Sequence, residues 1–307
     1  MRRVLVTGAR GFVGGAVTRY LCSKGVEVVA LVREDASKGR TDLPMSVITV
    51  PFDISSVEGY AQFIPKNDYD VFYHFAWSGS AGSARADVAL QLDNAKWAVD
   101  CLRLAERLGC KRFVGAGSIV EHETMAAAYT RGNKPGLGYV YGGGKLISHV
   151  MCASVAADVG IDLICPVLTN AYGPGEVSPR LVNTTLRKCL QRESPQFTSG
   201  TQNYDFVYID DVARAFYLIA ENGRPFNEYL IGSSTARPLK EFLLEMQKAV
   251  APDVEFIFGD IPFTGIDLPL SAFDCSVTER DTGFCAEVSF AEGACRTMQW
   301  IKEQETE

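Results

Sequence analysis

Near its start the chain reads Arg3-Val4-Leu5-Val6-Thr7-Gly8-Ala9-Arg10-Gly11-Phe12-Val13-Gly14. Its first five residues form a short apolar run typical of a strand, and residues 13–23 have helical periodicity. In a loop of this kind the first glycine permits a tight turn, the second lets the backbone approach a pyrophosphate, and the third lets the helix pack closely. A strand, a glycine loop and a helix in this order predict a dinucleotide site at the helix N-terminus.

Short apolar runs then alternate with segments long enough to be helices. The predicted strands are residues 3–7, 26–32, 46–50, 71–75 and 112–116, and residues 84–108 form the clearest predicted helix. Alternating strands and helices predict βαβ units with right-handed crossovers. We therefore expect an α/β protein with a doubly wound parallel sheet of the Rossmann type.

The pattern changes after Tyr172-Gly173-Pro174-Gly175, where it becomes irregular and richer in Pro and Gly. We expect residues 1–169 to form an NADP-binding Rossmann domain to which the segment 205–221 returns. Residues 170–204 and 222–307 are expected to form mostly a smaller α/β domain that binds substrate.

Composition narrows the class of protein. The net charge of −7 and the isoelectric point near 5.2 argue against a nucleic-acid partner or an anionic membrane surface. No apolar run approaches the roughly 20 residues that span a bilayer, and the early first strand predicts no signal peptide. Nine cysteines without a Cys-x-x-Cys pair suggest reduced thiols, and three histidines lack metal-ligand spacing. We expect a cytoplasmic protein without a metal.

The end of the second strand indicates which dinucleotide binds. An acidic residue there would bind the ribose hydroxyls of NAD, but the strand ends Ala30-Leu31-Val32-Arg33. Arg33 and Arg10 together suit a 2′-phosphate through charge-assisted hydrogen bonds. The sequence therefore predicts NADP(H). In the alternative, Glu34 or Asp35 binds the ribose and both arginines are solvated surface residues.

A second motif, Tyr141-Gly142-Gly143-Gly144-Lys145, lies far downstream. Its four-residue spacing places the phenol and the ammonium on one face of a helix. Each helical glycine costs about 1 kcal/mol relative to alanine, so the three glycines need an explanation. Either the cofactor or a neighbouring helix approaches this face closely, or the helix frays locally.

These motifs, in this order, resemble the extended short-chain dehydrogenase/reductase family, and specifically its nucleotide-sugar branch. The resemblance runs nearly end to end. Its segments are Thr7-Gly8-x-x-Gly11-x-x-Gly14, His74-Phe75-Ala76, Ser118, Tyr141-x-x-x-Lys145, Asn170-Ala171-Tyr172-Gly173-Pro174-Gly175, Asp205-Phe206-Val207-Tyr208-Ile209-Asp210-Asp211 and Glu292-Gly293 with Trp300.

The resemblance implies a role for each matching residue. Tyr141 would be the general acid or base, Lys145 would favour the phenolate and bind the nicotinamide ribose, and Ser118 would bind the same substrate oxygen. The implied cofactor-binding residues are Gly8, Arg10, Gly11, Phe12, Val13, Gly14, Arg33, Asp53 (to adenine), Ile54, Phe75, Ala76, Trp77, Tyr141, Lys145 and Leu168. The expected substrate-binding residues are Ser118 and Asn170, which match the family, and Arg180, which is a candidate from this sequence alone. For Trp77, ordinary core packing is the alternative to a ligand contact.

Departures from the family pattern favour one reaction. Dehydratases of the family carry Asp-Glu directly after the serine or threonine, whereas Ile119 and Val120 occupy these positions and cannot transfer protons. With Arg10 and Arg33, the chain looks closer to NADPH-dependent reductases of nucleotide-linked 4-keto-6-deoxyhexoses, such as CDP-abequose synthases and dTDP-fucose-forming reductases. The main alternative is a nucleotide-sugar 4-epimerase with bound NAD. Other carbonyl reductases, or a non-catalytic NADP-sensing protein, are further alternatives.

Two further departures concern the substrate. At the positions of Tyr204 and Val167, members of the family usually have arginines that bind the diphosphate of the substrate. Asn170 matches the family, and Arg180, Arg187 and Lys188 are candidates to replace the missing cations, unless they are solvated helix charges. The resemblance also implies a homodimer in which residues 84–108 and the Tyr141 helix form a shared bundle.

Overall fold

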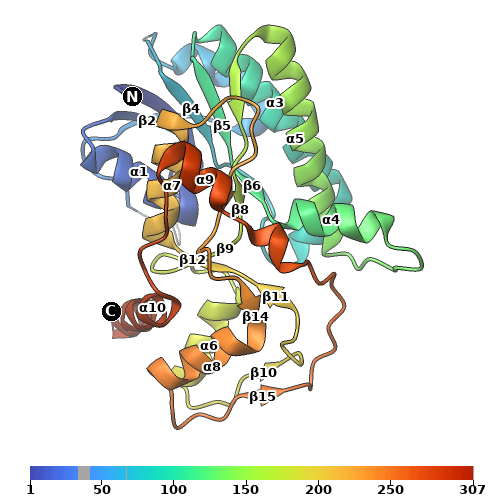
Figure 1. Ribbon diagram of the computed structural model, residues 1–307. Helices are drawn as coiled ribbons and strands as arrows, with labels where there is room; N and C mark the ends of the chain where they lie inside the picture. Colours follow the sequence, from blue (N-terminus) through green and yellow to red (C-terminus); the bar gives the residue numbers. More distant parts are fainter. Residues whose placement is uncertain (34–41, 67, 307) are drawn as a thin grey trace.

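The computed structural model describes residues 1–33, 42–66 and 68–306. Its main sheet is parallel, with the strand order β3-β2-β1-β4-β5-β7 (Figure 1). This is the doubly wound order, so the predicted α/β Rossmann-type fold is confirmed. The strands are β1 Arg3–Thr7, β2 Glu27–Val32, β3 Ile48–Pro51, β4 Val71–His74, β5 Arg112–Gly115 and β7 Asp162–Ile164.

Alternate residues of the central strand enter two different cores. Val4 and Val6 of β1 pack in a cluster with helices α1 (Phe12–Ser23) and α7 (Ile209–Asn222). Leu5 packs in a second cluster with helices α3 (Val88–Arg107) and α5 (Tyr139–Val159). Helices therefore cover both faces of the sheet, which explains why its strands are apolar throughout.

Most of the remaining elements lie below this sheet in Figure 1, whereas α9 (Ser276–Thr282) packs beside α7. Strands β13, β8 and β6 form a parallel three-stranded sheet, and three two-stranded sheets pair β12 with β9, β11 with β14 and β10 with β15. The strands are β6 Gly117–Ser118, β8 Val167–Leu168, β9 Asn170–Tyr172, β10 Gln196–Phe197, β11 Asn203–Tyr204, β12 Phe206–Tyr208, β13 Leu230–Ile231, β14 Arg237–Pro238 and β15 Ile257–Phe258. The helices are α2 Val57–Tyr60, α4 Val120–Tyr129, α6 Leu181–Leu190, α8 Leu239–Val250, α9 Ser276–Thr282 and α10 Phe290–Thr306, with 3-10 turns Ile54–Ser56, Ala61–Phe63, Gly82–Ala86 and Leu270–Phe273.

Several predicted bounds differ from the observed ones, and two of these differences have a clear structural cause. The helix predicted over 84–108 begins only at Val88, because Asp87 caps it and its side chain accepts a hydrogen bond from the Leu90 amide at 3.1 Å. The strand predicted over 112–116 ends at Gly115. After Ala116 the chain enters β6, which pairs with β8 in the three-stranded sheet.

Helix α7, in the segment 205–221, packs against α1 within the same core cluster. This packing supports our proposal that the segment returns to the cofactor-binding domain. Among the described residues, no helix combines the length and the apolar character needed to cross a membrane.

Two of the three glycines of α5 lie at close helix contacts. A Cβ on Gly142 would overlap the Thr124 hydroxyl and approach the carbonyl oxygen of Val120 to 2.9 Å, both on α4. A Cβ on Gly144 would lie 2.9 Å from the carbonyl oxygen of Gln91 on α3. A Cβ on Gly143 would meet nothing within 4 Å. Close approach of neighbouring helices therefore explains Gly142 and Gly144 but not Gly143.

Candidate active site

A cavity of about 840 Å³ opens at the carboxyl ends of the central strands. Open α/β sheets bind ligands at this edge. All the residues expected at the site line this cavity: Gly8, Arg10, Gly11, Phe12, Val13, Gly14, Arg33, Asp53, Ile54, Phe75, Ala76, Trp77, Ser118, Tyr141, Lys145, Leu168, Asn170 and Arg180. Glu34 and Asp35, the alternative ribose ligands, lie outside the described residues.

The glycine loop has the geometry that a pyrophosphate site requires. Gly8 has a φ of +71°, and a Cβ there would lie 2.6 Å from the amide nitrogen of Ala76. A Cβ on Gly14 would overlap the carbonyl oxygen of Gly8, so only glycine lets α1 pack this closely. Gly11 is the N-cap of α1, so no capping side chain covers the first N–H groups of the helix. These features fit an anion at the start of α1.

The adenosine end of the cavity contains both arginines of the cofactor prediction. Arg33 is exposed and Arg10 is half-buried, and both line the wall. Asp53 lies beside them, where one carboxylate oxygen accepts hydrogen bonds from the amide and the hydroxyl of Ser55 at 2.9 and 2.8 Å. Its other oxygen makes none of these bonds and is available to a ligand.

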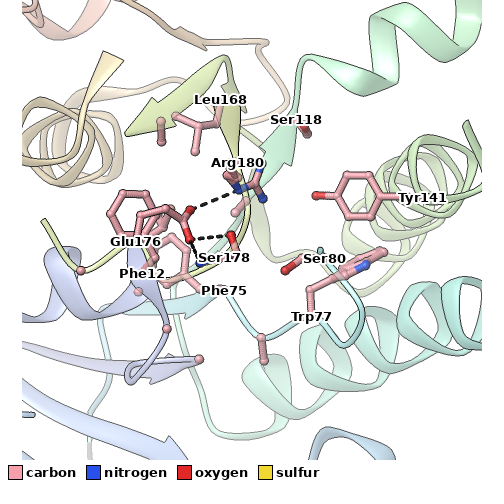
Figure 2. Close-up of a pocket in the computed structure, with 18 of the residues that line it drawn as sticks. Phe12, Phe75, Trp77, Ser80, Ser118, Tyr141, Leu168, Glu176, Ser178 and Arg180 are labelled. Atoms are coloured by element: carbon pink, nitrogen blue, oxygen red, sulfur yellow. Dashed lines mark hydrogen bonds and ion pairs between the residues drawn. The ribbon is translucent and has the colours of Figure 1, made fainter. Parts of the chain in front are cut away.

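The tyrosine and lysine of α5 lie on the opposite wall. The Lys145 ammonium donates to the carbonyl oxygen of Ala116 at 2.9 Å and sits 3.7 Å from the centre of the Trp77 ring. Tyr141 is buried and meets Trp77 edge-on. Figure 2 shows the Tyr141 hydroxyl directed into the cavity, with Ser118 and Trp77 on either side of it.

Trp77 packs against α3 and also lines the cavity. Its indole nitrogen donates to Gln91 at 2.8 Å, which anchors it to α3. One part of the ring also lines the cavity. Packing and ligand contact are therefore compatible at this residue.

The basic residues proposed for the substrate separate into two groups. Arg180 lines the cavity, where its guanidinium pairs with the buried Glu176 at 3.2 Å (Figure 2). Arg187 instead pairs with Glu305, and neither Arg187 nor Lys188 lines the cavity. Asn170 lines the wall and donates its side-chain amide to the carbonyl oxygen of Asp205 at 3.0 Å.

The two positions that depart from the family have different environments. Tyr204 lines the cavity, and burial raises the pKa of its hydroxyl to about 12, so it remains a hydrogen-bond donor. Val167 is a buried residue of β8, paired with Leu230 and Gly117. A long cationic side chain at position 167 would have to extend out of the core of this small sheet.

Besides Glu176, two charged residues of the cavity, Arg85 and Glu123, were not identified from the sequence. The Arg85 guanidinium lies 4.3 Å from the centre of the Tyr141 ring. Glu123 lies near Arg85, and burial raises the pKa of its carboxyl to about 7 although the guanidinium opposes the shift. Both also line a smaller cavity of about 220 Å³ that adjoins the first one. Neither belongs to a recognisable motif, so only the fold brings them to Tyr141.

The fold and the cavity define a class of protein: a Rossmann-type sheet, a glycine loop and a Tyr-x-x-x-Lys helix around one pocket are typical of short-chain dehydrogenases/reductases. Residues 4–232 match the NAD dependent epimerase/dehydratase family. The chain belongs to this family.

Curated relatives of the chain carry several names. A probable dTDP-glucose 4,6-dehydratase of Sinorhizobium fredii is 23% identical over 98% of this chain and 93% of its own length. A dTDP-4-dehydro-6-deoxy-D-allose reductase of a Streptomyces species is 26% identical over 73% of this chain and 74% of its own. The CDP-abequose synthase of Salmonella typhimurium is 31% identical, but over only 30% and 32% of the two chains.

Solved structures share the whole fold. The NAD-dependent NDP-hexosamine 5,6-dehydratase TunA superposes with a TM-score of 0.79, at 22% identity, over 99% of this chain and 98% of its own. MoeE5, solved with UDP-glucuronic acid and NAD, superposes with a TM-score of 0.78, at 22% identity, over 98% and 99%.

Proposed function

We propose that this chain is an NADPH-dependent reductase of the 4-keto group of a nucleotide-linked 4-keto-6-deoxyhexose, acting in deoxysugar biosynthesis for surface polysaccharides. The proposal is carried by one observation: Ser118, Tyr141 and Lys145 line the same cavity as the glycine loop and the two arginines. The names of the relatives, which include a reductase of a dTDP-linked 4-keto sugar, support the substrate class.

The roles follow from the positions of the side chains. Bound NADPH would supply the hydride. Tyr141, with its hydroxyl in the cavity, donates a proton to the carbonyl oxygen as that oxygen gains negative charge. Ser118 donates a hydrogen bond to the same oxygen, and Lys145 lies one helical turn from Tyr141, where its charge favours the phenolate left behind. Arg180, Asn170 and Tyr204, which line the cavity, would bind the diphosphate.

Dehydration is disfavoured by the residues after Ser118. Ile119 is buried and apolar, and Val120 presents an apolar side chain to the cavity. Neither can exchange a proton. This argument separates the chain from those relatives that are named dehydratases.

A 4-epimerase with bound NAD is the second candidate. It is supported by a UDP-glucuronic acid 4-epimerase of Bacillus cereus, which has a similar fold and was solved with NAD. An epimerase returns the hydride to the sugar and consumes no cofactor, so the two candidates differ in a measurable way.

The test follows nicotinamide absorbance after NADPH is mixed with CDP-, dTDP-, GDP- or UDP-linked 4-keto-6-deoxyhexoses. Stoichiometric oxidation of NADPH with one of them is the expected result. No oxidation with any of them, together with NAD that stays bound through purification, would replace the reductase by the epimerase.

A further inference from the structure

Ser118 ends a two-residue strand at the edge of a sheet. On one side, the amides of its neighbours Gly117 and Ile119 donate to the carbonyl oxygens of Pro166 and Leu168, each at 2.9 Å. The Ser118 amide points away from this ladder, because successive N–H groups of a strand alternate in direction. Ser118 is half-buried, so its amide at this edge requires another acceptor.

Glu121 supplies this acceptor. Its side chain is buried, and one carboxylate oxygen accepts the Ser118 amide hydrogen at 2.8 Å. The Ser118 hydroxyl oxygen in turn faces the amide of Val120 at 3.4 Å. Serine followed three residues later by glutamate is the pattern of a capping box, in which the glutamate bonds back to the serine amide at the start of a helix. Here that helix is α4.

Gly117 makes room for the carboxylate. A Cβ at this position would lie 3.1 Å from the bonded oxygen of Glu121 and 2.9 Å from the carbonyl oxygen of Pro166. The sequence Gly117-Ser118-x-x-Glu121 is therefore a single structural unit.

The second carboxylate oxygen of Glu121 accepts a hydrogen bond from a residue of another helix. It lies 3.0 Å from Nδ1 of His149, on α5, four residues beyond Lys145. Since a carboxylate only accepts, Nδ1 carries the hydrogen. The hydrogen bond with Glu121 raises the pKa of His149, although burial opposes the shift and the nearby His122 lowers it. Glu228 is the other carboxylate facing this imidazole, and the Cys165 thiol faces Glu121.

We propose that Glu121, anchored by His149, is a positioning residue that orients Ser118 toward the substrate oxygen shared with Tyr141. The carboxylate satisfies the Ser118 amide and ties its turn to α5, the helix that also carries Tyr141 and Lys145. The hydroxyl proton of Ser118 is then free for the substrate. This inference rests on the proposed function of Ser118.

The same helix offers a matched control. His122 and Glu228 form a second histidine–glutamate pair at 3.2 Å, but no hydrogen bond joins either of them to Ser118 among the described residues. His122→Gln therefore removes a similar pair without touching the serine turn.

The first arm of the test needs no substrate. Amide hydrogen exchange at Ser118 should be at least about tenfold faster in Glu121→Ala than in wild type, and unchanged in His122→Gln. Proton NMR should show that Glu121→Gln lowers the pKa of His149, because the hydrogen bond to the carboxylate that raises it is lost. His74 does not interfere, because burial lowers its pKa to about 3. Unchanged exchange at Ser118 in Glu121→Ala would overturn the inference whatever the substrate is.

The second arm uses NADPH and the 4-keto sugar that supports turnover. Glu121→Ala should lower kcat roughly tenfold or more without changing KM for NADPH, and Glu121→Gln, which keeps an acceptor, should recover part of the loss. In a Ser118→Ala background, Glu121→Ala should have no further effect, because it acts through Ser118. If Glu121→Ala lowered kcat by the same factor in the wild-type and the Ser118→Ala backgrounds, Glu121 would have only a structural role. A fully active Ser118→Ala would instead refute the proposed role of Ser118, and this inference with it.

Discussion

At the scale of single residues, Tyr141 carries the proposed chemistry. We expect Tyr141→Phe to lower kcat by about 100-fold or more, because general acid catalysis typically contributes factors of this size. NADPH binding should be nearly unchanged, since the ring and its contact with Trp77 remain. Stopped-flow turnover and fluorescence titration of NADPH measure the two quantities. Wild-type turnover in this variant would remove Tyr141 as the general acid.

Cofactor selectivity also belongs to individual residues. If Arg10 and Arg33 bind a 2′-phosphate, Arg33→Ala and Arg10→Ala should each weaken NADPH binding roughly tenfold, the usual effect of one lost charge-assisted hydrogen bond. NADH binding should not change. Calorimetric titration of both cofactors checks this, with Lys188→Ala as the control. If the substitutions weakened NADH and NADPH binding equally, the arginines would have no part in cofactor selectivity.

The shifted pKa of Glu123 predicts how the stability of the protein depends on pH. Its pKa rises from 4.5 to about 7 on folding, mainly through burial. Between these values the folded protein binds more protons than the unfolded chain, so this residue's contribution to stability falls as pH rises. The loss amounts to at most roughly 3 kcal/mol. Urea unfolding at about pH 5 and about pH 8 should therefore show Glu123→Gln gaining stability over wild type as pH rises.

The exposed Glu106 is the control for this measurement, because its carboxyl remains in solvent. Glu106→Gln should not show the pH-dependent gain. If the two variants behave alike, Glu123 does not carry the shifted proton.

At the scale of elements, α5 is positioned by its glycines. Gly144→Ala should destabilise the protein by about 1 to 3 kcal/mol, because the new methyl group meets the backbone of Gln91 on α3. Gly142→Ala should have a similar cost against α4. Gly143→Ala is the matched control. It should stabilise the protein by up to about 1 kcal/mol, since its Cβ enters open space and alanine favours the helix. Chemical unfolding measures the three free energies of unfolding. Equal values for the three variants would contradict this account.

At the scale of the whole molecule, we propose that α3 and α5 form the interface of a homodimer. The two helices lie side by side (Figure 1). Their outer surfaces carry exposed apolar side chains at helical spacing, namely Val88 and Leu92 on α3 and Ile147, Val150 and Met151 on α5. Exposed apolar side chains on two neighbouring helices are typical of an interaction surface.

Sedimentation velocity should therefore give a dimer, and Val150→Glu should shift it to a monomer. Leu244→Glu changes an equally apolar and exposed residue on α8, away from this patch, and should leave the dimer intact. A wild-type monomer at micromolar concentration would exclude the proposed interface.

The periodic parts of the fold were predictable from the sequence because local physics determines them. Apolar runs such as Val4-Leu5-Val6 become buried strands wherever helices cover both faces. Gly8, Gly11 and Gly14 mark the loop, and the spacing of Tyr141 and Lys145 places them on one helical face. The start of α3 was missed, because the capping role of Asp87 depends on a single side chain.

The charged residues around Tyr141 were not predictable. Arg85 and Glu123 belong to separate segments, and their sequences carry no motif. The hydrogen bond between Glu121 and His149 likewise depends on the packing of α4 against α5. A capping-box spacing after Ser118 was the one local signal.

The sequence alone therefore determined five of the six strands of the main sheet (all but β7), the glycine loop and the tyrosine–lysine pair, because each depends on residues within a few positions of one another. The tertiary structure decided which charges face the tyrosine, which cations reach the cavity and what holds Ser118 in place. These features depend on contacts between segments far apart in the chain, and such contacts exist only once the helices have packed on the sheet.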